Sequence, residues 1–148
     1  MRRWRSYEEA LAELTELEPA DRIPVLLMEY ENQTLQLQTD EVRRLFIYAW
    51  GAGPAETDRD HDVVRMLRWI APVRDVEVYL SGAVTLFRPA DDNDQAIRWM
   101  LDESHAAKNS HKVVRATIAS TDVLAHLTAE GADQVLVDPR DLSDVAPL

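Results

Sequence analysis

The chain has 148 residues, of which 46% are hydrophobic and 29% charged, with a formal net charge of −11 and no cysteine. This size and balance predict one folded globular domain, and acid spread evenly over both halves disfavours binding to nucleic acid or to anionic membrane. The lack of cysteine excludes disulfides and thiolate sites, and we expect a cytoplasmic protein.

The first part of the chain, residues 1–72, is predicted to be mainly helical. Ser6 and Glu9 have capping-box spacing and open a helix with apolar positions at helical intervals, which Pro19 ends. The apolar run 24–30 fits a helix that begins with proline or a short strand, and we favour the helix.

Two further helices are predicted before residue 73. Thr39 caps the first, which carries acidic residues in its opening turn and apolar residues along one face up to Trp50. Asp58 or Asp60 caps the second, which Pro72 closes.

The second part, residues 73–148, changes to β-forming composition with interspersed caps. Predicted strands are 76–79, 84–87, 112–118 and 134–137, and predicted helices begin at the caps Asp91–Asp94 and Ser120–Asp122, the latter running through Leu127. The fold class is therefore α+β, a single domain over 1–148 in which a helical N-terminal half packs on a small mixed or antiparallel sheet.

Arg88 is the residue on which a functional interpretation depends. It ends a predicted strand just before Pro89 and shares a face with Val84 and Leu86 by alternation. An arginine in this position either extends to solvent or is held to bind a planar anion, and the pattern leaves both open.

Five segments of the second part follow one another in a distinctive order: 84–88 (VTLFR), 94–100 (DQAIRWM), 113–118 (VVRATI), 121–126 (TDVLAH) and 131–139 (GADQVLVDP). Together they resemble ADP-ribosyltransferase-like domains, in particular those of small actinobacterial or phage proteins. The scarcity of lysine among the basic residues, with only Lys108 and Lys112, is typical of the GC-rich genomes of such hosts.

The resemblance implies a fold with an NAD cleft. It implies that Arg88 grips the NAD phosphates, with Trp99 on the following helix as a second contact. It also implies a serine-containing strand beside the nicotinamide and a glutamate on a later strand that steadies the ribose.

This sequence differs from the functional residues that the resemblance implies in two places. Residues 89–94 form a predicted acidic loop where the serine-containing strand would stand. The expected catalytic glutamate falls on Gln134, a neutral amide, and the adjacent Asp133 would replace it only if the strand register shifted by one. We therefore expect a non-catalytic relative that acts by binding a protein partner.

Two alternatives stay open. The first is an active mono-ADP-ribosyltransferase or NAD-consuming toxin in which Asp133 supplies the carboxylate. The second is a small acidic interaction protein unrelated to this family, in which Arg88 is a surface residue and Gln134 an ordinary strand residue. The sequence leaves the oligomeric state and the partner undetermined.

Other polar and aromatic clusters have simpler interpretations. Asp91–Asp94 lacks the glycine of a calcium loop and is interpreted as a helix cap. The histidines show no metal-binding spacing, so no metal site is predicted, and His126 is placed at the core edge of a short helix. Trp4, flanked by arginines, is predicted to form an exposed patch for a partner or a disordered terminus.

Overall fold

A computed structural model describes residues 4–32, 36–51, 60–76, 79–90, 96–108, 112–129 and 132–148. The chain divides into two compact units, Met1–Val73 and Arg74–Leu148. This division falls where the sequence predicts the change from the helical part to the α+β part, and the fold class is α+β. None of the described helices is both long and apolar enough to cross a membrane.

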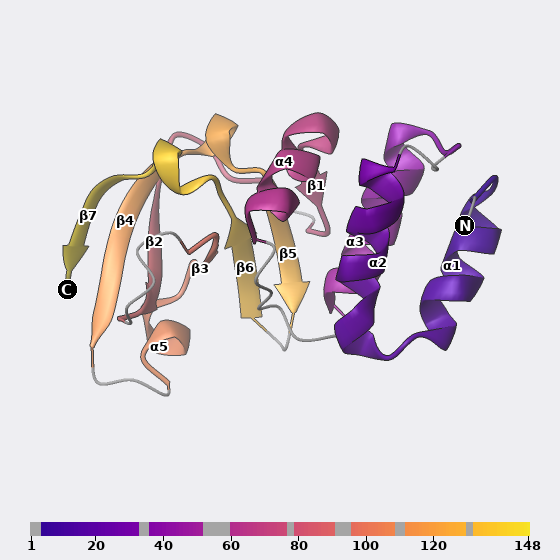
Figure 1. Ribbon diagram of the computed structural model, residues 1–148. Coiled ribbons are helices and arrows are strands. Elements are labelled where there is room, and N and C mark those ends of the chain that lie inside the picture. Colours follow the sequence, from indigo (N-terminus) through magenta and orange to yellow (C-terminus); the bar gives the residue numbers. More distant parts are fainter. Residues whose placement is uncertain are drawn as a thin grey trace. The chain divides into compact units, whose positions relative to one another are not determined.

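The first unit is built from helices (Figure 1). Their bounds are α1 (Tyr7–Glu16), α2 (Pro19–Glu31), α3 (Thr39–Gly51) and α4 (Asp60–Ile70). The predicted cap of α1 is confirmed, because the Ser6 hydroxyl accepts the Glu9 backbone N–H at 3.1 Å. The predicted helix over 24–30 is also confirmed, but α2 begins earlier, at Pro19, since a proline in the first turn gives up no helical hydrogen bond.

Helix α3 packs against α1, α2 and α4. Phe46 and Trp50, one turn apart on α3, stack with ring centroids 5.6 Å apart. The Arg43 side chain of the same helix donates to the Ile70 carbonyl and, at 3.5 Å, to the Ala71 carbonyl. Because the last carbonyls of a helix lack partners within it, Arg43 satisfies the C-terminal end of α4 from a neighbouring helix.

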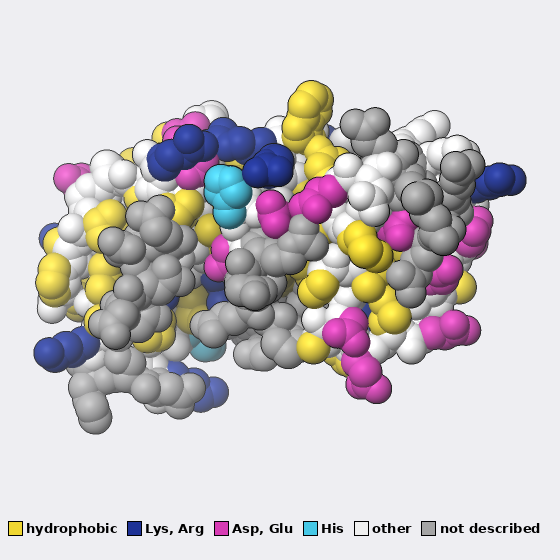
Figure 2. Space-filling view, viewed as in Figure 1, with side chains coloured by type: hydrophobic (Ala, Val, Ile, Leu, Met, Phe, Trp, Pro, Cys, Tyr) yellow, Lys and Arg dark blue, Asp and Glu magenta, His cyan; other side chains and the backbone are white. Residues whose placement is uncertain are grey.

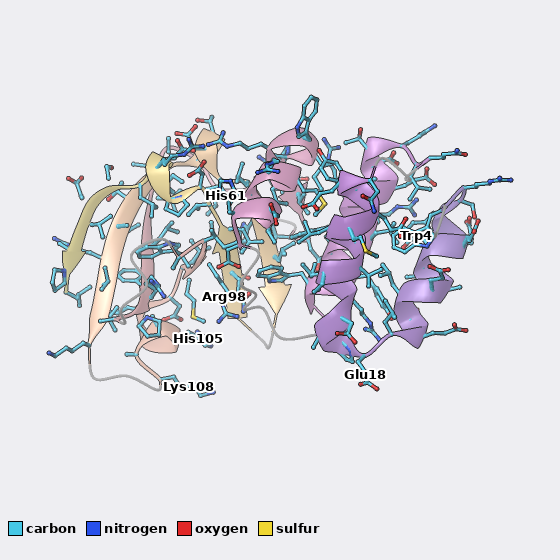
Figure 3. All side chains as sticks on the ribbon, viewed as in Figure 1. Trp4, Glu18, His61, Arg98, His105 and Lys108 are labelled. Carbon is cyan, nitrogen blue, oxygen red and sulfur yellow. The ribbon has the colours of Figure 1, made fainter. Side chains whose placement is uncertain are left out.

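Trp4 does not form the exposed patch that the sequence predicts. Its side chain is fully buried, and Figure 3 shows it beside α1. The indole Nε1–H donates to Glu13 Oε2 at 2.6 Å. The indole supplies apolar area together with one donor, so a single acceptor on α1 is enough to satisfy it when it is buried.

Among its described residues, the second unit consists of a sheet and one short α-helix. Its elements, together with β1 at the division between the units, are β1 (Val73–Arg74), β2 (Ala83–Pro89), β3 (Arg98–Met100), α5 (Glu103–Ala106), β4 (Val113–Ala119), β5 (Ala125–Ala129), β6 (Ala132–Leu136) and β7 (Ser143–Pro147). The described strands form a seven-stranded sheet in the order β1-β5-β6-β3-β2-β4-β7 (Figure 1). The pairings β2–β3, β2–β4, β3–β6, β4–β7 and β5–β6 are antiparallel.

One face of this sheet carries the core of the unit. Along β2, Val84 and Leu86 are buried while Ala83 and Thr85 are exposed, so alternation separates a core face from an open face. The core cluster consists of Val84, Leu86, Trp99, Ala116, Ile118, Val135 and Val137. Helix α5 packs against β2 and β3.

The prediction of a helix after residue 95 is wrong. Residues 98–100 form β3, and its predicted cap, Asp91–Asp94, lies outside the described residues. The apolar spacing of Ala96, Ile97 and Met100 imitates a helix, but β3 pairs with β2 on one side and β6 on the other. Tertiary pairing of this kind overrides local helix propensity.

The predicted helix through Leu127 is also wrong. Ser120–Asp122 forms a single 3-10 turn, and the chain then enters β5, which pairs along its whole length with β6. Strands near the predicted 84–87, 112–118 and 134–137 are confirmed as β2, β4 and β6. Val76 and Tyr79 are not in a strand, and the two residues between them lie outside the described residues.

Candidate functional site

The segments that carry the resemblance lie side by side in the sheet. Arg88 is on β2, Trp99 on β3 and Gln134 on β6, and these strands are consecutive in the order β6-β3-β2. The register joins them through Phe87 opposite Met100 and Met100 opposite Gln134. Segments well separated in the sequence therefore form one continuous surface.

Arg88 and Trp99 contact each other across β2 and β3. The Arg88 Cζ lies 5.6 Å from the centroid of the Trp99 ring. The indole is buried, and its Nε1–H is already used in a 3.2 Å hydrogen bond to the Ala96 carbonyl. Trp99 therefore offers the guanidinium the face of its ring, an arrangement that attracts a cation through the ring quadrupole.

Gln134 points to the opposite face of the sheet from Arg88. Residues directly opposite in an antiparallel pair share a face, and neighbours along a strand alternate. Gln134 is in the row of Met100 and Phe87, whereas Arg88 is one residue along from Phe87. The guanidinium and the carboxamide therefore cannot form two walls of one crevice on this sheet, and Gln134 is buried with 2% exposure.

Asp133 lies on the same face as Arg88. Its carboxylate accepts a 3.3 Å hydrogen bond from the Thr128 hydroxyl, directly opposite on β5. The other carboxylate oxygen is 3.7 Å from His126 Nε2, and the Asp133 side chain keeps 50% of its surface exposed. The carboxylate is thus held by a cross-strand partner and still reaches solvent.

His126 was predicted to lie on a short helix and instead lies on β5. It stands opposite Val135, which stands opposite Trp99, so the imidazole belongs to the same cross-strand row as Trp99 and Arg88. Its Nε2 atom is buried and has no hydrogen-bond partner among the described residues. An unsatisfied buried polar atom is uncommon in native proteins, and we therefore include His126 in the candidate site.

We call this side of the sheet the Arg88 face and define it by Arg88, Trp99, His126 and Asp133. It is the side that carries the core of the unit, and Trp99 and His126 are buried on it. It combines a cation, an aromatic ring, an imidazole and a half-exposed carboxylate. Arg88 and Trp99 were predicted as ligand residues, and Asp133 was considered as a substitute. His126 was not predicted as a site residue, because its face depends on the pairing of β5 with β6.

The opposite face carries a groove that sequence reasoning missed. It has a volume of about 490 Å³ and is lined by Thr85, Arg115, Thr117, Asp144, Val145 and Ala146. The alternation of threonine with buried residues along β2 and β4 was a signal for a solvent-facing side. Strand β7, which completes the groove, was not predicted.

Acidic side chains are scattered over both the helical and the sheet parts on the side that Figure 2 shows. Within the described residues, no three His, Asp or Glu side chains gather in a way that would hold a metal ion. The acidic stretch Asp91–Asp94 lies outside them.

No protein-family model, no curated protein and no solved structure matches this chain. Its function is therefore inferred from the geometry of its own residues.

Proposed function

We propose that the protein is a non-catalytic, ADP-ribosyltransferase-like protein that acts by binding another protein. The observation that favours the absence of catalysis is the placement of Arg88 and Gln134 on opposite faces of one sheet. The same placement counts against the family resemblance, which requires both residues to line one crevice. The residues that the resemblance assigns to phosphate binding and to the catalytic position therefore do not fit one NAD molecule. In addition, Gln134 is a neutral amide and supplies no negative charge at the late strand.

The adjacency of three strands supports the resemblance itself. The family pattern needs an arginine strand, a middle strand and a late strand that carries the catalytic position. The described strands β2, β3 and β6 are neighbours in the sheet, and β3 forms where the sequence predicts only a loop and a helix. This adjacency is what supports the proposed resemblance. The middle strand carries Trp99 where a serine would be expected.

An exposed tryptophan in the helical unit supports a protein partner. Trp69 on α4 keeps 76% of its surface exposed, and Arg65, one turn earlier on the same helix, keeps 59% of its side chain exposed and contacts Asp62 at 3.8 Å. Tryptophan and arginine are enriched among the residues that dominate binding at protein interfaces. Covering this exposed indole with a partner would remove its apolar surface from water, which favours binding.

Two experiments test this proposal. Incubation with labelled NAD and cell extract should transfer no label to any protein. Affinity capture should retain a defined partner that Trp69→Ala loses and that Tyr79→Ala, a change at another exposed aromatic residue, keeps. Transfer of label that Arg88→Ala abolishes, or a partner unaffected by Trp69→Ala, would refute the respective half.

A second candidate is an NAD-binding enzyme in which Asp133 replaces the usual glutamate. It is favoured by the placement of Asp133 on the Arg88 face, beside His126. Calorimetry with NAD separates it from the first proposal, because binding that both Arg88→Ala and Asp133→Ala weaken would favour the enzyme. Growth arrest on expression, relieved by either change, would favour it as well.

A third candidate is an interaction protein unrelated to this family. The contact of Arg88 with Trp99 would then be structural. It predicts no NAD binding and the same dependence on Trp69, so calorimetry with NAD distinguishes it from the enzyme.

A further inference from the structure

Strand β7 forms one edge of the sheet. It pairs with β4 on one side and is the last strand in the order. The Leu148 N–H donates to the Val113 carbonyl at 2.9 Å, and alternation counted back from this bond directs the N–H and C=O of Val145 away from β4. The pairing with β4 then shifts register between Arg115 and Thr117, where Asp144 has a φ of 54°, so the regular part of this edge begins at Val145. Pro147 also faces outward, where its missing N–H removes nothing from the β4 ladder.

The open edge carries apolar surface. Val145 is 56% exposed and Leu148 is 60% exposed. Unpaired backbone groups next to exposed aliphatic side chains form a template for an additional strand. The groove of about 490 Å³ lies directly beside this edge and includes Val145 and Ala146.

The same groove contains one basic and one acidic side chain. Arg115 on β4 and Asp144 on β7 are both exposed and both line it. Within the described residues, neither side chain has a hydrogen-bond or ion-pair partner. In the register, Arg115 stands opposite Ala146, whose small side chain leaves the guanidinium uncovered toward the edge.

We propose that two copies of this chain pair β7 with β7 in antiparallel orientation about a two-fold axis at Val145. The two valines then exchange backbone hydrogen bonds. Asp144 and Arg115 both line the groove beside Ala146, so the axis brings Asp144 of each copy to the side of the sheet that carries Arg115 of the other. The two sheets join through the short regular part of β7, with two symmetric ion pairs over the open face.

A second copy fits this edge better than an unrelated strand because the surface complements itself. Each copy offers one cation and one anion, placed so that a two-fold axis brings opposite charges together. The net charge of −11 opposes association of identical chains. Specific local pairing is therefore needed for a dimer, and reversal of one charge should abolish it.

Sedimentation velocity over a concentration series tests this inference, which does not depend on the proposed function. The wild-type protein should reach twice the 16.9 kDa of the chain. Arg115→Glu should give a monomer, since it places two acids together at each pair. The double variant Arg115→Glu with Asp144→Lys should restore the dimer.

Lys108→Glu is the matched control, because it makes the same change in net charge just beyond α5 (Figure 3). It should leave the dimer intact. Circular dichroism of each variant establishes that the sheet is retained. A wild-type monomer at every concentration, a dimer that Arg115→Glu leaves intact, or a double variant that stays monomeric while folded would overturn the proposal.

Discussion

The guanidinium of Arg88 lies over the indole of Trp99, its cross-strand neighbour, with 5.6 Å between Cζ and the ring centroid. This contact joins the strand that carries the arginine to the short strand β3. We expect Arg88→Met to lower the free energy of unfolding by about 0.5–2 kcal/mol, since a cation over an aromatic ring contributes in that range. Urea denaturation measures the effect, and an unchanged or raised stability would show that the contact is not formed.

The burial of Gln134 predicts how a restored glutamate behaves. Gln134→Glu places a carboxyl group where 2% of the residue is exposed. We expect a loss on the order of 3 kcal/mol at neutral pH, since burial raises a carboxyl pKa by several units at about 1.4 kcal/mol each.

The penalty should shrink as the pH falls toward the unfolded-state value of about 4.3, where the side chain is neutral in both states. Gln134→Met, of similar size and uncharged, is the control. Denaturation at several pH values measures both variants. A tolerated Gln134→Glu that gains transfer of ADP-ribose would contradict the assignment of Gln134 to the face opposite Arg88.

Replacement of two tryptophans of the helical unit by alanine should change the free energy of unfolding by very different amounts. Trp4 is fully buried and Trp69 is 76% exposed. Trp4→Ala should therefore lower the unfolding free energy by about 3–5 kcal/mol, and Trp69→Ala should change it by no more than about 0.5 kcal/mol. Thermal and urea unfolding measure both. A large loss of unfolding free energy from Trp69→Ala would indicate that Trp69 packs within the protein and is not free to bind a partner.

Arg43 should contribute to the attachment of α4. Its side chain donates to the carbonyls of Ile70 and Ala71. Arg43→Met keeps the apolar stem and removes the donors, and we expect a loss of about 1–3 kcal/mol, as for other charged hydrogen bonds. The neighbouring Arg44, which stacks on the Tyr7 ring at 4.1 Å, provides the comparison. Arg44→Met should lower the free energy of unfolding by about 1 kcal/mol or less. Equal losses for the two variants would contradict the assignment of Arg43 to the attachment of α4.

The cap of α5 predicts a measurable titration. The Ser104 hydroxyl and backbone N–H both donate to the Asp102 carboxylate, which holds the pKa of Asp102 below its usual value. A lowered folded-state pKa stabilises the fold above the unfolded-state value of about 3.9, and the contribution is lost as the pH falls through the folded-state pKa. NMR titration should show Ser104→Ala moving this pKa back upward. No change in that variant would show that the hydroxyl is not the cause.

Sequence reasoning could predict the helices of the first unit because their signals are local. The Ser6 cap and the apolar spacing of α1 act within one helix, as do the acidic first turn and apolar face of α3. Strand β3 could not be predicted in this way. It is three residues long, and the strands that pair its backbone, β2 and β6, lie before it and more than thirty residues after it in the chain.

The residues of the candidate site show the same difference between local signals and long-range strand pairing. Arg88 and Trp99 could be singled out from the residues and the resemblance, and they are neighbours. The face of Gln134 could not be settled, because a shift of one residue between β3 and β6 exchanges the faces of Gln134 and Asp133. The register that places Met100 opposite Gln134 puts Asp133, not Gln134, on the Arg88 face.

The most direct measurement is transfer of label from NAD to protein, with wild-type and Arg88→Ala chains assayed in parallel under identical conditions. We expect both to give the same background, because the arginine and the amide that the family pattern would join lie on different sides of the sheet. Transfer by the wild-type chain that disappears in both Arg88→Ala and Asp133→Ala would contradict the non-catalytic assignment.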